Sequence, residues 1–190
     1  PWLVRTDEDG EFVFMEQNEP VREELPEITA AVSFVLASIK RAQEIWPRLV
    51  SDVKEICGER LPGDDSAILE FSLAVMAVEM EALPNLLPVD QADRIREYVV
   101  QYVSDLSSEP WGREVLQDYG EVWKQAVHEV ENPLGAIASL LFDRLGCQAT
   151  TELAGVKYKS PLLLMFFMER IVLCNSGFWK RLIEKFRILP

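Results

Sequence analysis

Apolar residues recur at three- and four-residue steps along most of the chain, a spacing typical of helices packed on one face. From Pro26 onward this pattern predicts a series of helices, with proline, glycine, aspartate or asparagine near their ends. We expect helices over about 26–58, 66–83, 90–106, 111–130, 132–146 and 161–189. The first should kink or break before Pro47 and the last should bend near Gly177, while 148–160 is expected to be a loop that turns at Gly155. The sequence therefore predicts an all-α fold, an irregular bundle of six or seven helices.

The first 24 residues have a different pattern. Two short β-prone runs, 2–5 and 11–15, flank a segment that ends in Asp9-Gly10, which predicts a β-hairpin. A polar run over 16–24 is expected to be a linker. We therefore divide the chain into an N-terminal hairpin arm and linker, 1–24, and a single helical domain, 25–190. Because a lone two-stranded hairpin is marginal in water, we expect Trp2, Phe12 or Phe14 to pack on the helices or on another chain.

The stretch 160–174 is apolar on every side except at the adjacent pair Glu169 and Arg170. A helix that is apolar all round belongs in a protein core or in a membrane. This one is shorter than the roughly 20 apolar residues that span a bilayer and carries charges in its middle. We expect it to be the central strut of the bundle, with no stable membrane insertion.

Charge is unevenly distributed in this acidic chain, whose net charge is −13. Residues 157–190 contain seven basic and two acidic side chains, a net of +5, so 1–156 carry −18. An acidic body repels phosphates, and we expect no nucleic-acid binding. The three cysteines, Cys57, Cys147 and Cys174, lack paired spacing, and no basic start followed by an apolar run indicates a signal peptide. Both observations favour a cytoplasmic protein.

No motif in the sequence specifies a chemistry. The single histidine, His128, falls on the polar side of its predicted helix, and the Glu-x-x-His pairs of di-iron bundles are missing. Phosphate-binding glycine loops and nucleophile elbows are missing as well. We therefore predict no catalytic residue, no metal ligand and no cofactor.

Two charged positions nevertheless stand out because their surroundings are apolar. In the helix that spans 66–83, Glu79 lies among apolar residues, whereas Glu70 and Glu81 share the opposite stripe with two alanines, which we expect to face solvent. A buried carboxylate is costly unless it is paired or protonated. Arg170 in the last helix poses the same problem with the opposite sign. Either the two residues meet, forming a polar pocket with Glu169, or one of them reaches the rim of the bundle.

The C-terminal tail reads as a basic amphipathic helix. Such a helix packs on its own domain, binds a partner, or lies on an anionic membrane, and the sequence leaves these alternatives open. The candidate partner-binding face comprises Phe178, Leu182, Lys185 and Phe186.

From these observations we expect a non-enzymatic cytoplasmic interaction protein: an adaptor, a chaperone-like factor or a regulatory domain. Its partner would be another protein or a second copy of the chain. The alternative is a small-ligand-binding or enzymatic helical domain with an internal pocket around Glu79 and Arg170. A deep pocket with convergent polar groups would favour the alternative, and an exposed apolar patch would favour the first hypothesis.

Overall fold

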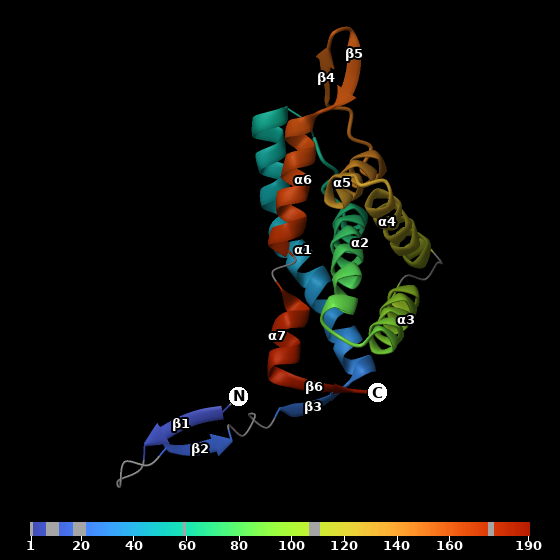
Figure 1. Cartoon of the computed structure of the whole chain (residues 1–190). Helices are drawn as coiled ribbons and strands as arrows, with labels where there is room; N and C mark the ends of the chain where they lie inside the picture. The colour runs from blue at the N-terminus through green and yellow to red at the C-terminus, as the bar shows by residue number, and fades with distance from the viewer. Residues whose placement is uncertain (1, 7–11, 17–21, 59, 107–110, 175–176) are drawn as a thin grey trace.

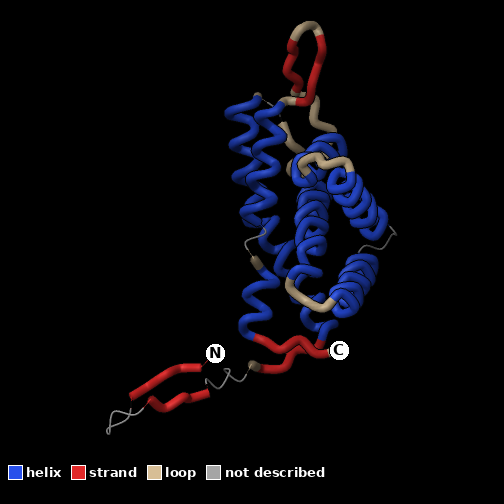
Figure 2. The backbone as a smooth tube through the Cα atoms, viewed as in Figure 1, coloured by secondary structure: helices blue, strands red, loops and turns tan. Residues whose placement is uncertain are grey.

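A computed structural model describes residues 2–6, 12–16, 22–58, 60–106, 111–174 and 177–190. It confirms the predicted all-α bundle with an N-terminal strand pair (Figures 1 and 2). The helices are α1 (Glu27–Cys57), α2 (Asp65–Ala82), a short 3-10 turn (Leu83–Asn85), α3 (Val89–Leu106), α4 (Trp111–His128), α5 (Pro133–Arg144), α6 (Pro161–Cys174) and α7 (Phe178–Lys185). The strands are β1 (Trp2–Thr6), β2 (Phe12–Glu16), β3 (Glu23–Pro26), β4 (Thr150–Leu153), β5 (Val156–Lys159) and β6 (Phe186–Leu189).

The centre of the bundle is α2, not the apolar C-terminal stretch that we expected there. α2 begins at Asp64, whose side chain accepts a hydrogen bond from the backbone N–H of Ala67 at 3.0 Å, as expected for a helix cap. Buried residues then occur on every side of the helix. The helices α1, α4, α5 and α6 pack around it (Figure 1).

The prediction that one stripe of α2 faces solvent is therefore wrong. Glu70, Ala74 and Ala77 are buried, and Glu81 is largely covered. The reason is α4, which lies across this side of α2 and brings Gly120 close to the Glu81 carboxylate. Small residues on a helix face permit close approach of a second helix as readily as they indicate solvent.

α6 is a peripheral helix, which corrects the expectation of a central strut. It packs against α1 and α5 and more sparsely against α2. Only Leu163, Phe167 and Ile171 of α6 are fully buried. These residues recur at four-residue steps, so one side of the helix enters the core and the other side remains outside.

α1 is the longest helix and continues through Pro47 without a break. It is bent along its length instead (Figure 1), and it ends at Gly58, whose φ of 67° suits the left-handed cap of a helix. Beside the proline, Trp46 is buried against Phe71 and donates a hydrogen bond to the Pro62 carbonyl at 3.1 Å. The anchored tryptophan keeps both halves of α1 against α2.

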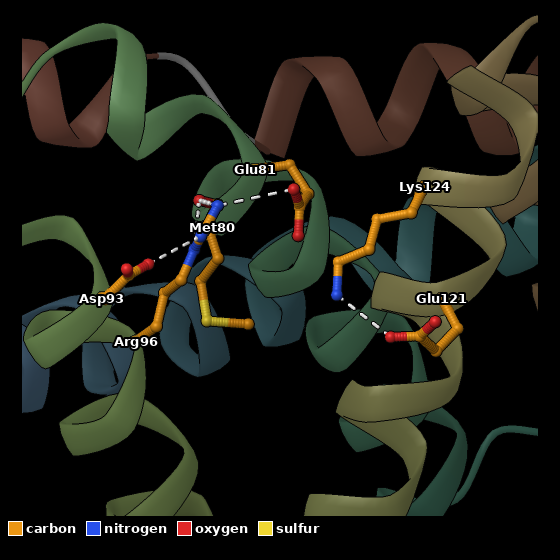
Figure 3. A network of polar contacts seen from close by, with 6 residues as sticks. All are labelled: Met80, Glu81, Asp93, Arg96, Glu121 and Lys124. Atoms are coloured by element: carbon orange, nitrogen blue, oxygen red, sulfur yellow. Dashed lines mark hydrogen bonds and ion pairs between the residues drawn. The ribbon is translucent and has the colours of Figure 1, made fainter. Parts of the chain in front are cut away.

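Two arginines of α3 fasten it to the other helices. Arg94 binds the buried Glu27 carboxylate with two hydrogen bonds of 2.9 and 3.0 Å, which hold the pKa of that carboxyl below its ordinary value. Arg96 donates to the Met80 carbonyl at 3.0 and 3.1 Å and pairs with Glu81 at 3.4 Å (Figure 3). A cation at the last turn of α2 satisfies its end carbonyls and complements the helix dipole.

Three strand pairs accompany the helices, and only β1–β2 follows the prediction. This antiparallel pair aligns Trp2 with Glu16 and Thr6 with Phe12. The packing of Trp2, Phe12 and Phe14 on helices stays a prediction, because their side chains lie outside the described part of the structure.

The second pair, β3 with β6, is parallel and corrects two expectations. Glu23 and Glu24 belong to a strand and not to a linker, and the C-terminal helix stops at Lys185. Arg22 donates to the Ile183 carbonyl at 2.9 Å and Gln91 donates to that of Ile188 at 3.1 Å, which fixes the ribbon to α7 and α3.

The third pair replaces the predicted loop over 148–160. β4 and β5 form an antiparallel hairpin that extends beyond the end of the bundle (Figure 1). Its two-residue turn consists of Ala154 and Gly155, with φ of 53° and 80°. Left-handed conformations at both central residues match the twist of a tight hairpin, so the expected turn at Gly155 is present.

The buried Trp179 provides a test of how firmly α7 holds to the body. Its ring lies 4.8 Å from that of Phe34 and is fully buried, and its Nε1 has no hydrogen-bond acceptor among the described residues. Trp179→Ala should lower the free energy of unfolding by about 3–5 kcal/mol in urea titrations. Trp179→Phe should cost much less, since no hydrogen bond is lost. The exposed neighbour is the control: Lys180→Ala should change stability by less than about 0.5 kcal/mol, and an equal loss in both alanine variants would contradict the packing.

Candidate functional site

The most unusual surface of the protein joins the outer side of α6 to the hairpin β4–β5. On this surface, large apolar side chains are 41–70% exposed. Scattered exposed apolar residues are normal, whereas a contiguous group marks an interaction site. We call the group the α6–hairpin face and define it by Leu153, Val156, Tyr158, Leu162, Met165, Val172 and Leu173.

The helical period explains why α6 has two apolar sides. Its inner side, centred on Phe167, contributes to the core beside α1 and α5. Its outer side holds Leu162, Met165 and Val172, whose spacing of three and seven residues places them on a common stripe. Glu169 is exposed near the middle of that stripe. A surface helix of a globular protein usually carries polar residues on its outer side, and α6 departs from this pattern.

The hairpin contributes the second half of the face. Residues paired across antiparallel strands share a side of the ribbon, so the pairs Leu153–Val156 and Thr151–Tyr158 lie together. On the other side, Lys159 binds the Ser139 hydroxyl at 2.7 Å and also binds the carboxylate of Asp143. The polar side of the hairpin is thereby fastened to α5, and the apolar side is left uncovered.

The α6–hairpin face is hollowed where its two halves meet. A cavity of about 460 Å³ lies between the hairpin and the start of α6. A second hollow of about 330 Å³ is lined by Met165, Phe166 and Glu169. Hollows of this size accept large apolar side chains, and such anchors dominate the energetics of protein interfaces. The first cavity is lined by Thr151, Leu153, Tyr158, Lys159, Pro161 and Leu164.

The residues of the predicted polar pocket have different partners in the structure. Glu79 is only 6% exposed, and this burial raises its pKa to about 7, opposed by the positive charge of Arg181 on α7. Arg170 pairs instead with Asp52 of α1 at 2.8 Å, and Glu169 is exposed on the α6–hairpin face. Glu79 is thus a buried acid, as its apolar neighbours indicated, but its cationic neighbour comes from α7.

The predicted partner-binding face of the tail is divided between two elements. Phe178 and Leu182 are half-buried in α7, and the Phe178 ring lies 5.4 Å from that of Phe34. Phe186 belongs to β6, and exposed Lys185 lies over its ring at 5.0 Å. The apolar part of this face therefore packs largely on the domain, one of the alternatives that the sequence left open.

A buried polar cluster that the sequence did not reveal lies between α2, α4 and α5. The Tyr119 hydroxyl donates to the Glu70 carboxylate at 2.7 Å, and the Arg144 guanidinium lies 3.6 Å from the same carboxylate and also pairs with Asp118. Burial raises the pKa of Glu70, while Tyr119 and Arg144 oppose that rise. A cavity of about 230 Å³ beside it is lined by Pro62, Asp64, Ser66, Ala67, Glu70, Trp111, Arg144 and Leu145. The one hint in the sequence was Tyr119 itself, since a buried tyrosine hydroxyl needs a partner.

The remaining candidate sites are a polar groove, possible metal ligands, the histidine and the cysteines, and none of them combines a hollow with exposed apolar side chains. A wide groove of about 750 Å³ between α4 and α5 is lined mainly by polar and small residues, including Glu129 and Asp143. Over the described ranges, no three histidine, cysteine, aspartate or glutamate side chains gather as they would around a metal ion. His128 is exposed, as predicted, and all three cysteines are thiols.

The stretch Pro161–Lys185, which runs from α6 through the undescribed residues 175–176 into α7, is long and apolar enough to cross a membrane by length and composition alone. Core helices of soluble proteins pass the same test, so the finding is weak by itself. Only 25% of its most apolar part is buried, however, which again indicates how much of α6 is uncovered.

Comparison with family models, with curated proteins and with solved structures finds no match to this chain. The α6–hairpin face gathers seven of the exposed large apolar side chains of the described residues.

Burial of Glu79 leads to a prediction about pH. Its folded-state pKa of about 7 lies above the ordinary 4.5, so the fold favours the protonated form. The resulting destabilisation grows as the pH rises from about 4.5 to 7, and it amounts to about 3 kcal/mol above that range. Glu79→Gln should therefore stabilise the protein at pH 8 by up to about 3 kcal/mol and have little effect at pH 4.5, as measured by urea unfolding.

Exposed Glu169 supplies the matched control for this experiment. Glu169→Gln removes the same charge from the surface of α6 and should change the free energy of unfolding at pH 8 by less than about 0.5 kcal/mol. If Glu79→Gln had the same effect at both pH values, Glu79 would be solvated or ionised in the fold.

The hydroxyl of Tyr119 should be important for stability and not for any chemistry. Tyr119→Phe removes the 2.7 Å hydrogen bond to Glu70 while keeping the ring in the core. The loss of a bond to a charged group should cost about 1.5–3 kcal/mol of unfolding free energy. Without that hydroxyl the pKa of Glu70 should rise further, so the cost should be larger at pH 8 than at pH 5. A cost below 0.5 kcal/mol at both pH values would indicate that water replaces the hydroxyl.

Proposed function

We propose that this protein is a non-enzymatic interaction module that binds a protein partner through the α6–hairpin face. The observation that carries this proposal is the exposed, hollowed apolar surface formed by α6 together with β4–β5. We also propose that it acts in the cytoplasm, which is consistent with its three thiols.

The size of the face fits a binding role. Fully burying a Val, Leu or Met side chain contributes about 1.5–3 kcal/mol, so covering the seven roughly half-exposed side chains of the face would contribute about 5–10 kcal/mol. Losses of freedom and desolvation on association cost about 4–15 kcal/mol, so a surface of this size supports reversible binding.

The chemistry of the face also suggests how a partner would be selected. The two hollows would receive apolar anchor side chains, and the exposed carboxylate of Glu169 lies beside the second hollow. A single charge at the centre of an apolar surface favours a partner that supplies a donor or cation at that position and disfavours others. The outward apolar side of the hairpin extends the contact area beyond the bundle.

The alternative, a small-ligand-binding or enzymatic domain, has less support. Its best candidate is now the cavity beside Glu70, whose volume of about 230 Å³ is smaller than the roughly 300 Å³ of typical ligand pockets. The Glu70 carboxylate already accepts a hydrogen bond from Tyr119 and faces Arg144. These polar groups satisfy one another, as the members of a structural network do.

Site-specific photocrosslinking in cells of the source organism tests the proposal. Met165→p-benzoylphenylalanine places a photoreactive group on the face, and Val127→p-benzoylphenylalanine places it on α4, where Val127 is 56% exposed. We expect one dominant adduct at position 165 that is missing at position 127. The captured chain, once purified, should bind the native protein at least tenfold more tightly than it binds Met165→Asp.

Two outcomes would count against the proposal. One is the lack of a discrete adduct at position 165, and the other is the same adduct pattern at both positions. Unchanged affinity of Met165→Asp for the captured chain would show that the contact lies elsewhere.

A further inference from the structure

The partner of the α6–hairpin face can be narrowed by the one exposed charge that the described residues place on it, Glu169, provided that the proposed binding function holds. The residues one helical turn away from this glutamate are all apolar: Met165, Phe166, Val172 and Leu173. No side chain of α6 therefore pairs with it at the three- or four-residue spacing of a helix. Within the described ranges, its carboxylate takes part in no hydrogen bond or ion pair.

The cations of α6 and of the hairpin are directed away from this carboxylate. Arg170 pairs with Asp52 of α1 at 2.8 Å. Lys159 is fastened to α5, and Lys157 lies on the opposite side of the hairpin from its apolar residues. The negative charge of Glu169 is thus left uncompensated on an apolar surface.

The position of Glu169 means that a partner which covers α6 must also cover its carboxylate. At 100° per residue, the exposed residues Leu162, Met165 and Val172 lie on both sides of it around the helix. A carboxylate that loses water and gains neither a cation nor a hydrogen-bond donor is strongly unfavourable. An entirely apolar partner is therefore disfavoured. A second copy that presents the same face with the two-fold axis beside Glu169 is disfavoured as well, because two carboxylates would meet.

The hollow beside Glu169 has the chemistry of a site for a basic side chain. Its volume is about 330 Å³, and it is lined by Met165, Phe166 and Glu169. A carboxylate pairs with a cation, an aromatic ring attracts one, and apolar walls cover the methylene stem of lysine or arginine. The cavity between the hairpin and the start of α6 differs, because Lys159 is the one charged residue in its lining and is already bound to Asp143. This cavity suits a large apolar side chain.

The two hollows are close enough to be filled by one short segment. Pro161 and Leu164 line the first cavity, and 165–169 line the second hollow. With a rise of 1.5 Å per residue, their centres lie about 7 Å apart along α6. Residues two positions apart in a strand, or three to four positions apart in a helix, are separated by about 5–7 Å on one side of the segment.

We propose that the α6–hairpin face binds a segment of another protein that carries a large apolar residue and, two to four positions away, a lysine or arginine. The apolar side chain fills the cavity under the hairpin. The basic side chain lies along Met165 and Phe166 and pairs with Glu169.

The test selects peptides from a phage-displayed library of random 12-residue sequences on four full-length proteins: wild type, Met165→Asp, Glu169→Lys and Glu97→Lys. Peptides enriched on the wild type should carry the proposed pair and bind Met165→Asp at least tenfold more weakly. Selection on Glu169→Lys should no longer enrich basic residues. Glu97 is exposed on α3, away from α6 (Figure 1), so Glu97→Lys makes the same change of charge elsewhere and should select the same peptides as the wild type. Circular dichroism establishes that each variant is folded.

A double-mutant cycle then assigns the contact to Glu169. One peptide selected on the wild type is compared, by fluorescence anisotropy, with a version in which its basic residue is glutamine. The dissociation constant should rise at least fivefold on the wild type and change less than twofold on Glu169→Gln. Equal rises on both proteins would show that the basic residue contacts another acid of this chain and would overturn the inference.

The remaining outcomes separate this inference from the proposed function. Peptides that depend on Met165 but contain no basic residue, or that bind Glu169→Lys as tightly as the wild type, would overturn the inference and leave the binding function standing. A library that yields only peptides indifferent to Met165→Asp would overturn both.

Two other occupants of the face are tested with the same variants. A wild-type dimer in sedimentation equilibrium that becomes tighter in Glu169→Gln would assign the face to a second copy. Binding to vesicles of phosphatidylcholine and phosphatidylglycerol that is lost in Met165→Asp would assign it to a lipid surface. Either result would overturn the inference.

Discussion

The fold depends on covering α2 on every side. Its sequence offers no continuous polar stripe, so neither face of the helix can be left to water without a large hydrophobic penalty. Four helices meet this requirement, with α1, α4, α5 and α6 arranged around α2. The position of each of them is a consequence of this constraint, and α3, α7 and the β3–β6 ribbon complete the lower end of the bundle in Figure 1.

Covering α2 on all sides also buries two of its acidic residues, Glu70 and Glu79, and these two carboxyls have different neighbours. Glu70 meets Tyr119 and Arg144, so its charge has partners inside the bundle. Glu79 has the more distant charge of Arg181, and burial raises its pKa to about 7. An acid that is half-protonated near neutral pH reduces stability at the pH of most cells, and α2 tolerates it because the apolar core around it is large.

The uncovered side of α6 follows from the same geometry. α6 completes the shell around α2 with its inner side, and no further helix of the described chain lies over its outer side. Leu162, Met165 and Val172 then remain exposed, and the outward side of the hairpin continues the apolar surface. This apolar surface stays exposed in the folded chain, and it is the surface through which we propose that the protein binds a partner.

Sequence periodicity by itself determined much of the protein. The all-α class, the N-terminal strand pair and most helix ends follow from local rules, because caps such as Asp64 and stops such as Gly58 act over a few residues. The apolar residues around Glu79 in the sequence likewise predicted that its carboxyl is buried. These features depend on short-range geometry and on the cost of desolvating a charge.

Only the tertiary structure decided which apolar helix became central. The sequences of α2 and α6 are both apolar, and the helices that pack around each one determine which of the two is enclosed. It also decided that Arg170 pairs with Asp52, that Glu70 is buried under α4, and that Phe186 leaves the helix to join β3. The hairpin over 150–159 escaped prediction for a related reason. Its turn is Ala-Gly instead of a strong turn pair, and it is fastened by Lys159 of β5, which binds Asp143 of the separate helix α5. Contacts between segments far apart along the chain are not encoded in any local pattern, and the candidate site consists of such segments.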